Sequence, residues 1–362
     1  MRVTSAGFNI STCAGSAKPQ AAGRAVRTML ELTTNNALAF ARARGWIAPG
    51  PATVAELSGG VSNAVLRVEA NGRVLILKQS RPQLRTRDAW FSDVDRVYRE
   101  QEVMEALHPL LPAGIVPKVL HADRPNYVFA MSSAPADARN WKQQLLKGDI
   151  EFDLGYQVGA VLGQLHQMTA ERRTEFERFR DRTVFVQLRV DPFYRRIQQR
   201  RPEVAAAIAP LIEQLMDANE ALCHADYSPK NILTHDETFT LVDYETAHLG
   251  DPTMDLGFCA SHLLLKEVAS TGSRDRLLEL VRLFWRGYGS TARFQPLGEL
   301  EARGVAHCGV CLLARVDGTS PVDYLTTETQ RETVRRLGRM ILLDGVRTWD
   351  EVLNAVHVSR ET

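Results

Sequence analysis

The sequence predicts an α+β fold of two lobes, in which a small antiparallel sheet precedes a larger helical part. Up to Met131, short apolar or alternating runs are separated by turn residues, which is typical of strands. Beyond Met131, most apolar residues recur at helical spacing. Strands followed by a run of helices are typical of an α+β chain. We therefore expect a disordered extension over residues 1–30, a first lobe over 31–131 and a helical second lobe over 132–362.

The expected first lobe combines helices with strands. Its helices cover Leu32–Trp46 and Ser92–Leu107, where apolar residues follow one face. The dipeptide Asn71-Gly72 favours a tight hairpin turn. The expected strands are Val61–Glu69 and Val74–Lys78 on either side of that turn, then Val119-Leu120 and Tyr127–Met131.

The expected second lobe is mainly helical. A loop is expected at Cys223–Asn231, followed by a short hairpin of Ile232–Thr234 and Thr240–Val242. The helices are expected at Trp141–Leu146, Leu154–His166, Pro202–Ala218 and through most of the chain after Asp251. A crevice between a sheet lobe and a helical lobe is a natural place for a ligand site.

Composition and charge exclude several classes of protein. The 362 residues carry a formal net charge of +1, whereas proteins that hold a nucleic-acid backbone usually show a clear basic excess. The near-neutral charge therefore argues against nucleic acid as a partner. No apolar run approaches the roughly 18 residues of a membrane span, so we do not expect a membrane as a partner either. Residues 1–30 are basic and rich in Ser, Ala and Gly, as in a transit peptide, but a disordered extension or an upstream start before Met29 explains them better.

The cysteines favour a reducing compartment, because their number, five, is odd; we expect a cytoplasmic protein. Cys308 and Cys311 form the string CGVC inside the apolar run AHCGVCLLA. A structural metal site needs four ligands, and no second pair has matching spacing. Buried helix packing therefore explains this string better than metal or redox chemistry, although a thiol-based redox protein stays as an alternative.

The string HADYSPKN, His224–Asn231, carries the chemistry together with Asp243 in the string LVDYE. Phosphoryl transfer from a nucleotide needs an oriented acceptor oxygen, held phosphates and a metal that offsets their charge. Asp226 could orient a hydroxyl and accept its proton, and Asn231 and Asp243 could ligate Mg²⁺, which prefers hard oxygen ligands. Asp and Asn are also frequent turn residues, but a turn does not explain the spacing to Asp243.

This order, HxDxxxxN followed by an apolar strand that ends in Asp, resembles the catalytic and metal-binding loops of protein-kinase-like enzymes and implies their bilobal fold. The resemblance makes His224 a structural residue that braces the loop. Upstream, the string LSGGVSN could bring backbone amides close to phosphates. The nucleotide-binding residues expected there are Ser58, Gly59, Gly60, Ser62 and Asn63.

Lys78 ends the strand VLILK, which is the position of the phosphate-pairing lysine in kinases. Glu100 on the following helix is the best candidate for an ion pair with Lys78, and Glu102 and Glu105 are its competitors. A lysine exposed at the end of a strand is the alternative interpretation of Lys78.

From about Leu57 to Leu264 the sequence resembles the aminoglycoside phosphotransferase and choline kinase group. The string HLGDPTMDLGF matches the pattern that follows the metal aspartate in that group, which implies that Asp255 fixes the backbone of the catalytic loop. The group usually has glycine at the position of Ala225. Glu245 could help to hold a second Mg²⁺ or form a loop salt bridge, and both roles are left open.

The segment between the strand lysine and the helix glutamate also resembles methylthioribose kinase, at positions Gln79, Pro82, Arg85 and Trp90. That family has twin arginines near its C-terminus that serve the sugar, and Arg335 and Arg336 form a loose match, although arginine pairs are frequent on helix surfaces. Two features depart from that family, namely the presence of an asparagine in the catalytic loop and the metal string LVDYETAH.

The polar stretch LLARVDGTSPVDYL is unusual in a helical region. Its residues Arg315, Asp317 and Ser320 could line an acceptor pocket, and a loop between two helices is the simpler explanation. An aminoglycoside acceptor would require an acidic pocket, and no dense acidic run is present in the helical lobe, so a neutral sugar or an amino alcohol fits at least as well.

Together these features predict a small-molecule kinase. It would move the γ-phosphoryl group of ATP or GTP to a hydroxyl of an aminoglycoside, a methylthioribose-like sugar or an amino alcohol, with Mg²⁺ as cofactor. A nucleotide-binding pseudokinase that acts as an interaction module is the alternative function. The sequence predicts no oligomeric state.

Overall fold

The computed structural model describes residues 30–57, 63–81 and 92–361. Residues 32–362 form one compact unit. The extension expected over residues 1–30 lies almost wholly outside the described residues, and its state stays a prediction. None of the described helices combines the length and the apolar character needed to cross a bilayer.

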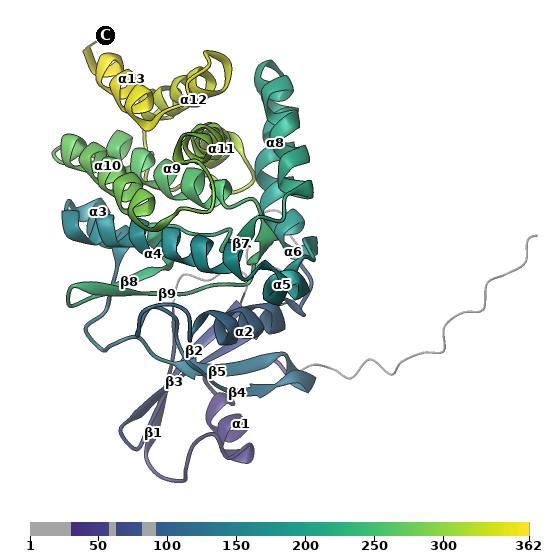
Figure 1. The fold of residues 1–362 in the computed structure, drawn as a ribbon. Helices are drawn as coiled ribbons and strands as arrows, with labels where there is room; N and C mark the ends of the chain where they lie inside the picture. The colour runs from purple at the N-terminus through teal and green to yellow at the C-terminus, as the bar shows by residue number, and fades with distance from the viewer. Residues whose placement is uncertain (1–29, 58–62, 82–91, 362) are drawn as a thin grey trace, which may run out of the picture. The chain divides into compact units, whose positions relative to one another are not determined.

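A five-stranded antiparallel sheet opens the fold, with strand order β1-β2-β3-β5-β4 (Figure 1). The Asn71-Gly72 turn joins the second and third strands, and both turn residues have positive φ, as the sequence predicts. The strands are β1 (Ala52–Glu56), β2 (Asn63–Ala70), β3 (Arg73–Ser80), β4 (Val119–Asp123) and β5 (Val128–Ser132). The sheet ends at Ser132, and the predicted two-lobed α+β fold is confirmed, whereas the expected lobe boundary after residue 131 stays a prediction.

Alternate residues of the central strand β3 face opposite sides of the sheet. Leu75 and Leu77 pack in one core cluster with α1 (Ala37–Ala43), whereas Ile76 and Phe129 pack in another with α2 (Arg96–Leu107). Because side chains alternate along a strand, Lys78 faces the same side as Ile76 and α2. The pleat of β3 therefore directs Lys78 toward the helix on which its predicted partner lies.

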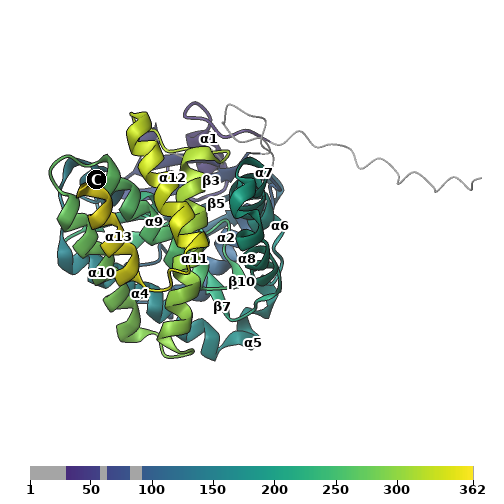
Figure 2. The ribbon, with the colours of Figure 1, turned by 90° about the horizontal axis from the view of Figure 1, so that it is seen from above.

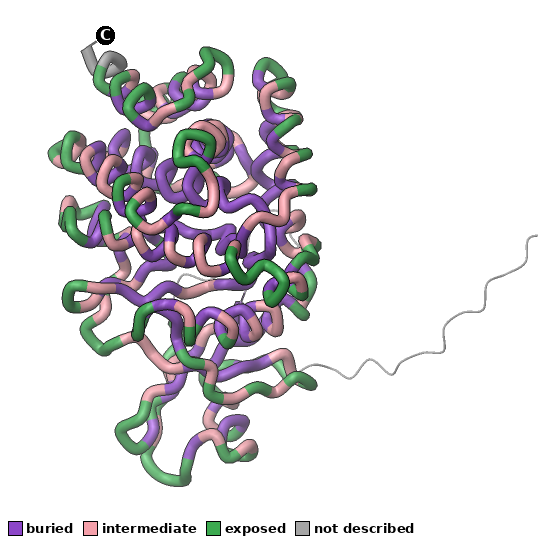
Figure 3. Tube along the Cα trace, in the orientation of Figure 1, coloured by how far each residue is buried: buried purple, intermediate pink, exposed green. Residues whose placement is uncertain are grey.

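The helical part follows β5 and is arranged around α9. Every residue from Thr253 to Val268 is buried, which makes α9 the centre of the helical core (Figure 3). The longer helices are α3 (Trp141–Lys147), α4 (Phe152–Glu171), α8 (Ala205–Asp217), α9 (Thr253–Ala269), α10 (Arg274–Thr291), α11 (Leu297–Asp317), α12 (Glu328–Leu343) and α13 (Trp349–Glu361). Figure 2 looks onto α12 and α13, which close the helical part on the side away from the sheet.

Helices α4 and α10 approach each other closely because glycines lie at their contact. A Cβ atom on Gly159 would lie 1.9 Å from the carbonyl oxygen of Phe284, and one on Gly287 would lie 2.0 Å from that of Tyr156. These distances are far shorter than any non-bonded contact, so the close packing requires glycine at both positions.

Short strands carry the loops of the predicted site. Strand β7 (Ala221–Cys223) pairs with β10 (His248–Gly250), and the expected loop begins where β7 ends. The expected hairpin is formed by β8 (Ile232–His235) and β9 (Thr238–Leu241), and β8 also pairs with β6 (Arg139–Asn140). This hairpin returns the chain from the catalytic loop to Asp243.

The structure differs from the sequence expectation in several places, among them the edge strand β1 (Ala52–Glu56), which was not predicted, and α2, which begins at Arg96 rather than Ser92. The helix expected over Leu32–Trp46 is shorter and spans only Ala37–Ala43. The region after residue 182 is helical, although no element was predicted there, and it includes the π-helix Val186–Arg195. Pro192 lies inside this π-helix and has no amide hydrogen, so a regular α-helix is interrupted there.

Cys308 and Cys311 lie buried in α11, in keeping with the predicted helix packing. Burial raises the pKa of the Cys308 thiol well above its usual range and that of Cys311 to about 12. Both thiols are therefore protonated at neutral pH, which does not suit thiolate chemistry.

Candidate active site

Asp255, near the start of α9, holds the catalytic loop from the side of the helical core. One carboxylate oxygen accepts a hydrogen bond from the backbone N–H of His224, and the other accepts one from that of Ala225, both at 2.7 Å. Asp255 is fully buried and also contacts His166 Nε2 at 3.3 Å. Its contacts are those that the family resemblance implies for a structural aspartate.

The ring of His224 braces the loop from inside. Its Nε2 lies 3.2 Å from the carbonyl oxygen of Val242, and its Nδ1 lies 3.2 Å from the backbone N–H of Asp226. These contacts suit a neutral ring that donates from Nε2 and accepts at Nδ1. Burial lowers the pKa of His224, which favours the same neutral form.

Ala225 adopts a left-handed backbone conformation with φ of 59°. Glycine reaches this region without strain, whereas an L-residue with a Cβ atom pays roughly 1–2 kcal/mol. The hydrogen bond from Ala225 N–H to Asp255 holds the residue in this conformation.

Asp226 is surrounded by donors. Its Oδ1 lies 2.8 Å from Arg189, and its Oδ2 lies 2.8 Å from Asn231 Nδ2 and 3.4 Å from Lys230 Nζ. Burial would raise the pKa of Asp226, but Arg189 and Lys230 outweigh it and hold that pKa below its usual value. The carboxylate is therefore ionised at neutral pH and can accept a hydrogen bond from a hydroxyl.

Lys78 connects the sheet to the metal-binding segment. Its Nζ lies 2.8 Å from Glu100 Oε1 and 2.6 Å from Asp243 Oδ1, and all three side chains are largely buried. The pairing with Glu100, rather than with Glu102, is the one expected from the sequence. Burial opposes ionisation of Asp243, but the charge of Lys78 prevails and lowers its pKa well below the usual range.

Asn231 and Asp243 offer a donor set that suits Mg²⁺. The Nδ2 group of Asn231 donates to the backbone oxygen and to Oδ2 of Asp226, which turns its amide oxygen away from that carboxylate. Asp243 is 20% exposed and its second oxygen lies 3.7 Å from Lys230 Nζ. One amide oxygen and one carboxylate are hard donors of the kind that this ion prefers. Within the described ranges, no group of three or more His, Cys, Asp or Glu side chains has metal-binding geometry.

Glu245 occupies the salt-bridge role that the sequence left open. Its Oε2 accepts hydrogen bonds from Arg96 Nε at 3.0 Å and from Asn63 Nδ2 at 2.8 Å. Asn63, one of the residues expected to bind nucleotide, thus links the start of β2 to the metal-binding segment. The other four, Ser58, Gly59, Gly60 and Ser62, lie outside the described residues, as do Pro82, Arg85 and Trp90.

The residues predicted to bind the acceptor are divided between two places. Arg315 lies close enough to Asp226 for that carboxylate to oppose the lowering of the Arg315 pKa by burial. Asp317, the last residue of α11, instead pairs with Arg335 at 3.1 Å and with Arg201 at 2.7 Å, and Arg336 is exposed on α12. The stretch Leu312–Leu325 comprises the end of α11, which carries Arg315, and part of the connection to α12, so a loop between helices accounts for its second half.

Sequence reasoning missed Arg189 and Lys230. Lys230 lies within the motif, and its position directly before Asn231 was a signal that could have been used. Arg189 has no such signal, because it comes from the π-helix, far from the motif in sequence. Its guanidinium also donates to the carbonyl oxygen of Ala225 at 2.6 Å, so it holds the loop as well as Asp226.

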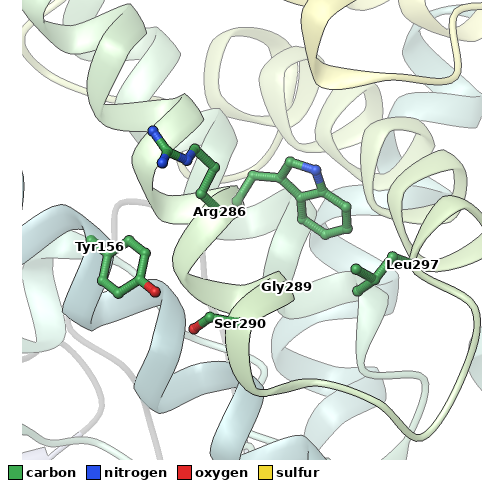
Figure 4. A pocket seen from close by; sticks show the side chains of 6 residues that line it. Tyr156, Arg286, Gly289, Ser290 and Leu297 are labelled. Atoms are coloured by element: carbon green, nitrogen blue, oxygen red, sulfur yellow. The ribbon is translucent and has the colours of Figure 1, made fainter.

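A shallow pocket lies elsewhere in the helical part, between α4, α10 and the start of α11 (Figure 4). Its lining includes Tyr156, Trp285 and Arg286 and contains none of the residues predicted to act in catalysis.

Comparison with known proteins identifies the family. The model of the phosphotransferase enzyme family matches residues 53–300. A 4-hydroxytryptamine kinase of Psilocybe cyanescens is 27% identical over an alignment of 243 positions, which covers 58% of this chain and 66% of that protein, so the match spans about two thirds of the relative's length. A methylthioribose kinase of Exiguobacterium sibiricum is 24% identical over 302 residues and 75% of each chain.

Two solved structures show the same fold. An amicoumacin kinase in complex with AMP-PNP and Ca²⁺ has a TM-score of 0.52 and 14% identity, over 83% of this chain and 91% of that chain. A choline kinase from Cryptosporidium parvum Iowa II has a TM-score of 0.52 and 11% identity, over 90% of this chain and 99% of that chain. Because the family model covers more than half of the chain, this protein belongs to the phosphotransferase enzyme family and is a small-molecule kinase.

Proposed function

We propose that this protein transfers the γ-phosphoryl group of ATP or GTP to a hydroxyl group of a small molecule with the help of Mg²⁺. The observation that carries the proposal is the convergence of two chains of contacts, Glu100–Lys78–Asp243 and Asn231–Asp226, at the catalytic loop. Each of these side chains has a part in phosphoryl transfer from a nucleotide.

The nucleotide would be held from the sheet side. Lys78 projects from β3 and is kept in place by Glu100, so its ammonium group can contact the α- and β-phosphates. Asn231 and Asp243 would hold Mg²⁺, which offsets the negative charge of the phosphates when it is bound. ATP binding is expected for this family, and the choice between ATP and GTP stays a prediction.

Asp226 would orient the acceptor. Its ionised carboxylate accepts a hydrogen bond from the acceptor hydroxyl, so that the hydroxyl oxygen can attack the γ-phosphorus. As the new P–O bond forms, the bond to the nucleoside diphosphate breaks and the hydroxyl proton passes to Asp226. Arg189 makes Asp226 a weak base, which suits a loose transition state in which the proton leaves late.

The relatives do not determine the acceptor. One is named for an aromatic amine and the other for a thiosugar, and the two solved structures are named for still other acceptors. An aminoglycoside, a methylthioribose-like sugar and an amino alcohol therefore all stay candidates at this level.

The variant Asp226→Asn tests the mechanism, because the amide keeps the shape of the side chain and cannot accept a proton. We expect turnover to fall by about 10²–10⁴-fold, with nucleotide binding nearly unchanged. A coupled assay of nucleoside diphosphate release with sugars, aminoglycosides and amino alcohols measures the rate, and calorimetry measures binding. Near-normal rates in this variant would show that Asp226 does not have this role.

A further inference from the structure

A cluster of basic side chains lies on the helical side of the catalytic loop. Lys142 belongs to α3, Lys230 to the loop itself, His262 and Lys266 to α9, and Arg315 to α11. Burial, reinforced by the positive charges of the other four residues, holds the pKa of His262 well below its usual range. Elements that are far apart in sequence thus bring several cations around one histidine.

The inner cations of this cluster, Lys266 and Arg315, donate to backbone carbonyl oxygens rather than to a carboxylate. Lys266 is 2% exposed, and its Nζ donates to the carbonyl oxygen of His262 at 2.9 Å. Arg315 donates to the carbonyl oxygen of Ser320 at 3.0 Å. Across the ranges that the structure describes, neither forms an ion pair. Lys142 pairs with Asp323 at 3.6 Å, but that carboxylate is 85% exposed and points to solvent.

Polar atoms without partners face the same region. Tyr324 Oη, His262 Nε2 and Arg315 Nε are buried and have no hydrogen-bond partner among the described residues. The Tyr324 ring lies 5.5 Å from the ammonium group of Lys142 and 5.4 Å from that of Lys266. Leaving a buried polar group without a partner is destabilising, so a bound acceptor of hydrogen bonds would stabilise this arrangement.

One aromatic ring contacts both the cluster and the arginine that pairs with the catalytic aspartate. The guanidinium groups of Arg315 and Arg189 lie 5.5 and 5.4 Å from the centre of the Phe258 ring, and the His262 ring lies 5.1 Å from it. Arg189 in turn lies 2.8 Å from Asp226. Arg315 and Arg189 thus lie against the same ring, so the cluster adjoins the arginine that pairs with Asp226.

We propose that Lys266, Arg315, His262 and Tyr324 form an anion-binding subsite, and that the acceptor is a hydroxy compound carrying a carboxylate or phosphate group. The inference rests on the proposed kinase function and names its substrate class. The anionic oxygens accept hydrogen bonds from Lys266 Nζ, the Arg315 guanidinium and the Tyr324 hydroxyl. A cationic amine would add to the positive charge of the cluster and is rejected by it.

Matched sets of alcohols that differ only in charge test this subsite. A three-carbon set is glycerate, glycerol and 2-amino-1,3-propanediol, and a six-carbon set is gluconate, glucitol and glucamine; glycerol 3-phosphate separates phosphate from carboxylate. We expect kcat/KM for the anionic member to exceed that for the neutral member at least tenfold, with the amine lowest. A preference for a neutral or amine member would overturn the subsite and leave the kinase function standing.

Variants of the cluster show whether the preference comes from these residues. Arg315→Met and Lys266→Met should lower kcat/KM at least tenfold more for the anionic member than for the neutral member of each set. Arg286→Met, on the exposed side of α10, is the matched control and should change neither. An equal loss for every member of a set would mean that the residues act only on the structure, which would overturn the proposal.

A binding measurement decides the case in which no alcohol of the panel is turned over. Calorimetry with inorganic sulfate, in the presence of Mg²⁺ and saturating AMP-PNP, should show saturable binding to the unmodified protein and none to Arg315→Met. Absence of binding, or equal binding to both, would overturn the subsite. Failure of the protein to bind AMP-PNP with Mg²⁺ would instead contradict the kinase function itself, so the two failures are distinguishable.

Discussion

Two groups of charged residues flank the catalytic loop, and their charges are balanced differently. On the sheet side, Lys78 contacts both Glu100 and Asp243, and Arg96 contacts Glu245, so each buried cation has a carboxylate partner. On the helical side, Lys266 and Arg315 contact backbone carbonyl oxygens instead. Balanced charges keep a conformation in place, whereas buried cations without a counter-charge lower stability and are retained where a ligand supplies that charge.

The largest effect on stability is expected from removing Lys78, the cation that pairs with two carboxylates on the sheet side. Lys78→Met would leave the carboxylates of Glu100 and Asp243 buried near each other without a cation. We expect the free energy of unfolding to fall by about 3–5 kcal/mol, because an uncompensated buried charge is costly. We also expect nucleotide turnover to be lost, because the phosphates lose their lysine. Urea denaturation and the coupled assay measure the two effects.

A second substitution separates these two effects. In Lys78→Met/Glu100→Leu the helix carboxylate is also removed, and apolar side chains replace the ion pair. Much of the lost stability should return, since apolar replacement of a buried pair is often neutral, whereas activity should not return. A double variant as unstable as Lys78→Met would mean that the ion pair between them does not account for the loss.

On the helical side, where the buried cations lack a carboxylate partner among the described residues, we expect removal of a cation to raise the stability of the protein instead of lowering it. Lys266→Met removes a buried cation and keeps a side chain of similar length, so we expect the protein to become more stable by about 1–2 kcal/mol. Thermal unfolding without ligand measures this change. A clear decrease in stability would mean that Lys266 has a stabilising partner, which would contradict the difference between the two regions.

The pH dependence of stability sharpens the same comparison. Burial, with Lys142 and Arg315 nearby, lowers the pKa of Lys266 to about 7 from its ordinary value of 10.5. Between these two values the unfolded chain binds a proton that the folded protein has released, so the Lys266 contribution makes stability rise with pH from about 7 to about 10.5. Unfolding free energies measured across this range should rise less steeply in Lys266→Met than in the unmodified protein.

The smallest effect is expected at Ala225, which belongs to neither group of charges. Ala225→Gly removes a Cβ atom from a residue with φ of 59°, so the strain of the folded loop is relieved by roughly 1 kcal/mol. The greater freedom of glycine in the unfolded chain offsets part of this gain. We expect an unfolding free energy within about 1 kcal/mol of the original and nearly unchanged turnover. A large loss of activity would show that the loop needs the methyl group.

The spacing of residues along the chain was sufficient to predict the strand, turn and helix that carry the motif residues. The Asn71-Gly72 turn, the strand that carries Lys78 and the helix with Glu100 all follow from residue spacing, although the strand continues two residues beyond Lys78 to Ser80. The alternation of β3 brings Lys78 and Glu100 together. Asp255 was placed by resemblance, and its two hydrogen bonds to the loop show why a buried carboxylate is needed there. The π-helix Val186–Arg195 escaped prediction although it is amphipathic, because Pro192 lies inside it and a proline in the middle of a segment argues against a helix.

The sequence by itself determined the two-lobed fold, the order of the chemical groups and their assignment to loop, strand and helix, because these depend on short spacings along the chain. Only the tertiary structure decided which charges are balanced. Arg189 reaches Asp226 from a distant segment, and Lys142, Lys266 and Arg315 meet around His262 from three helices separated by long stretches of sequence. Such meetings depend on how whole helices pack around α9, and no spacing along the chain encodes that packing.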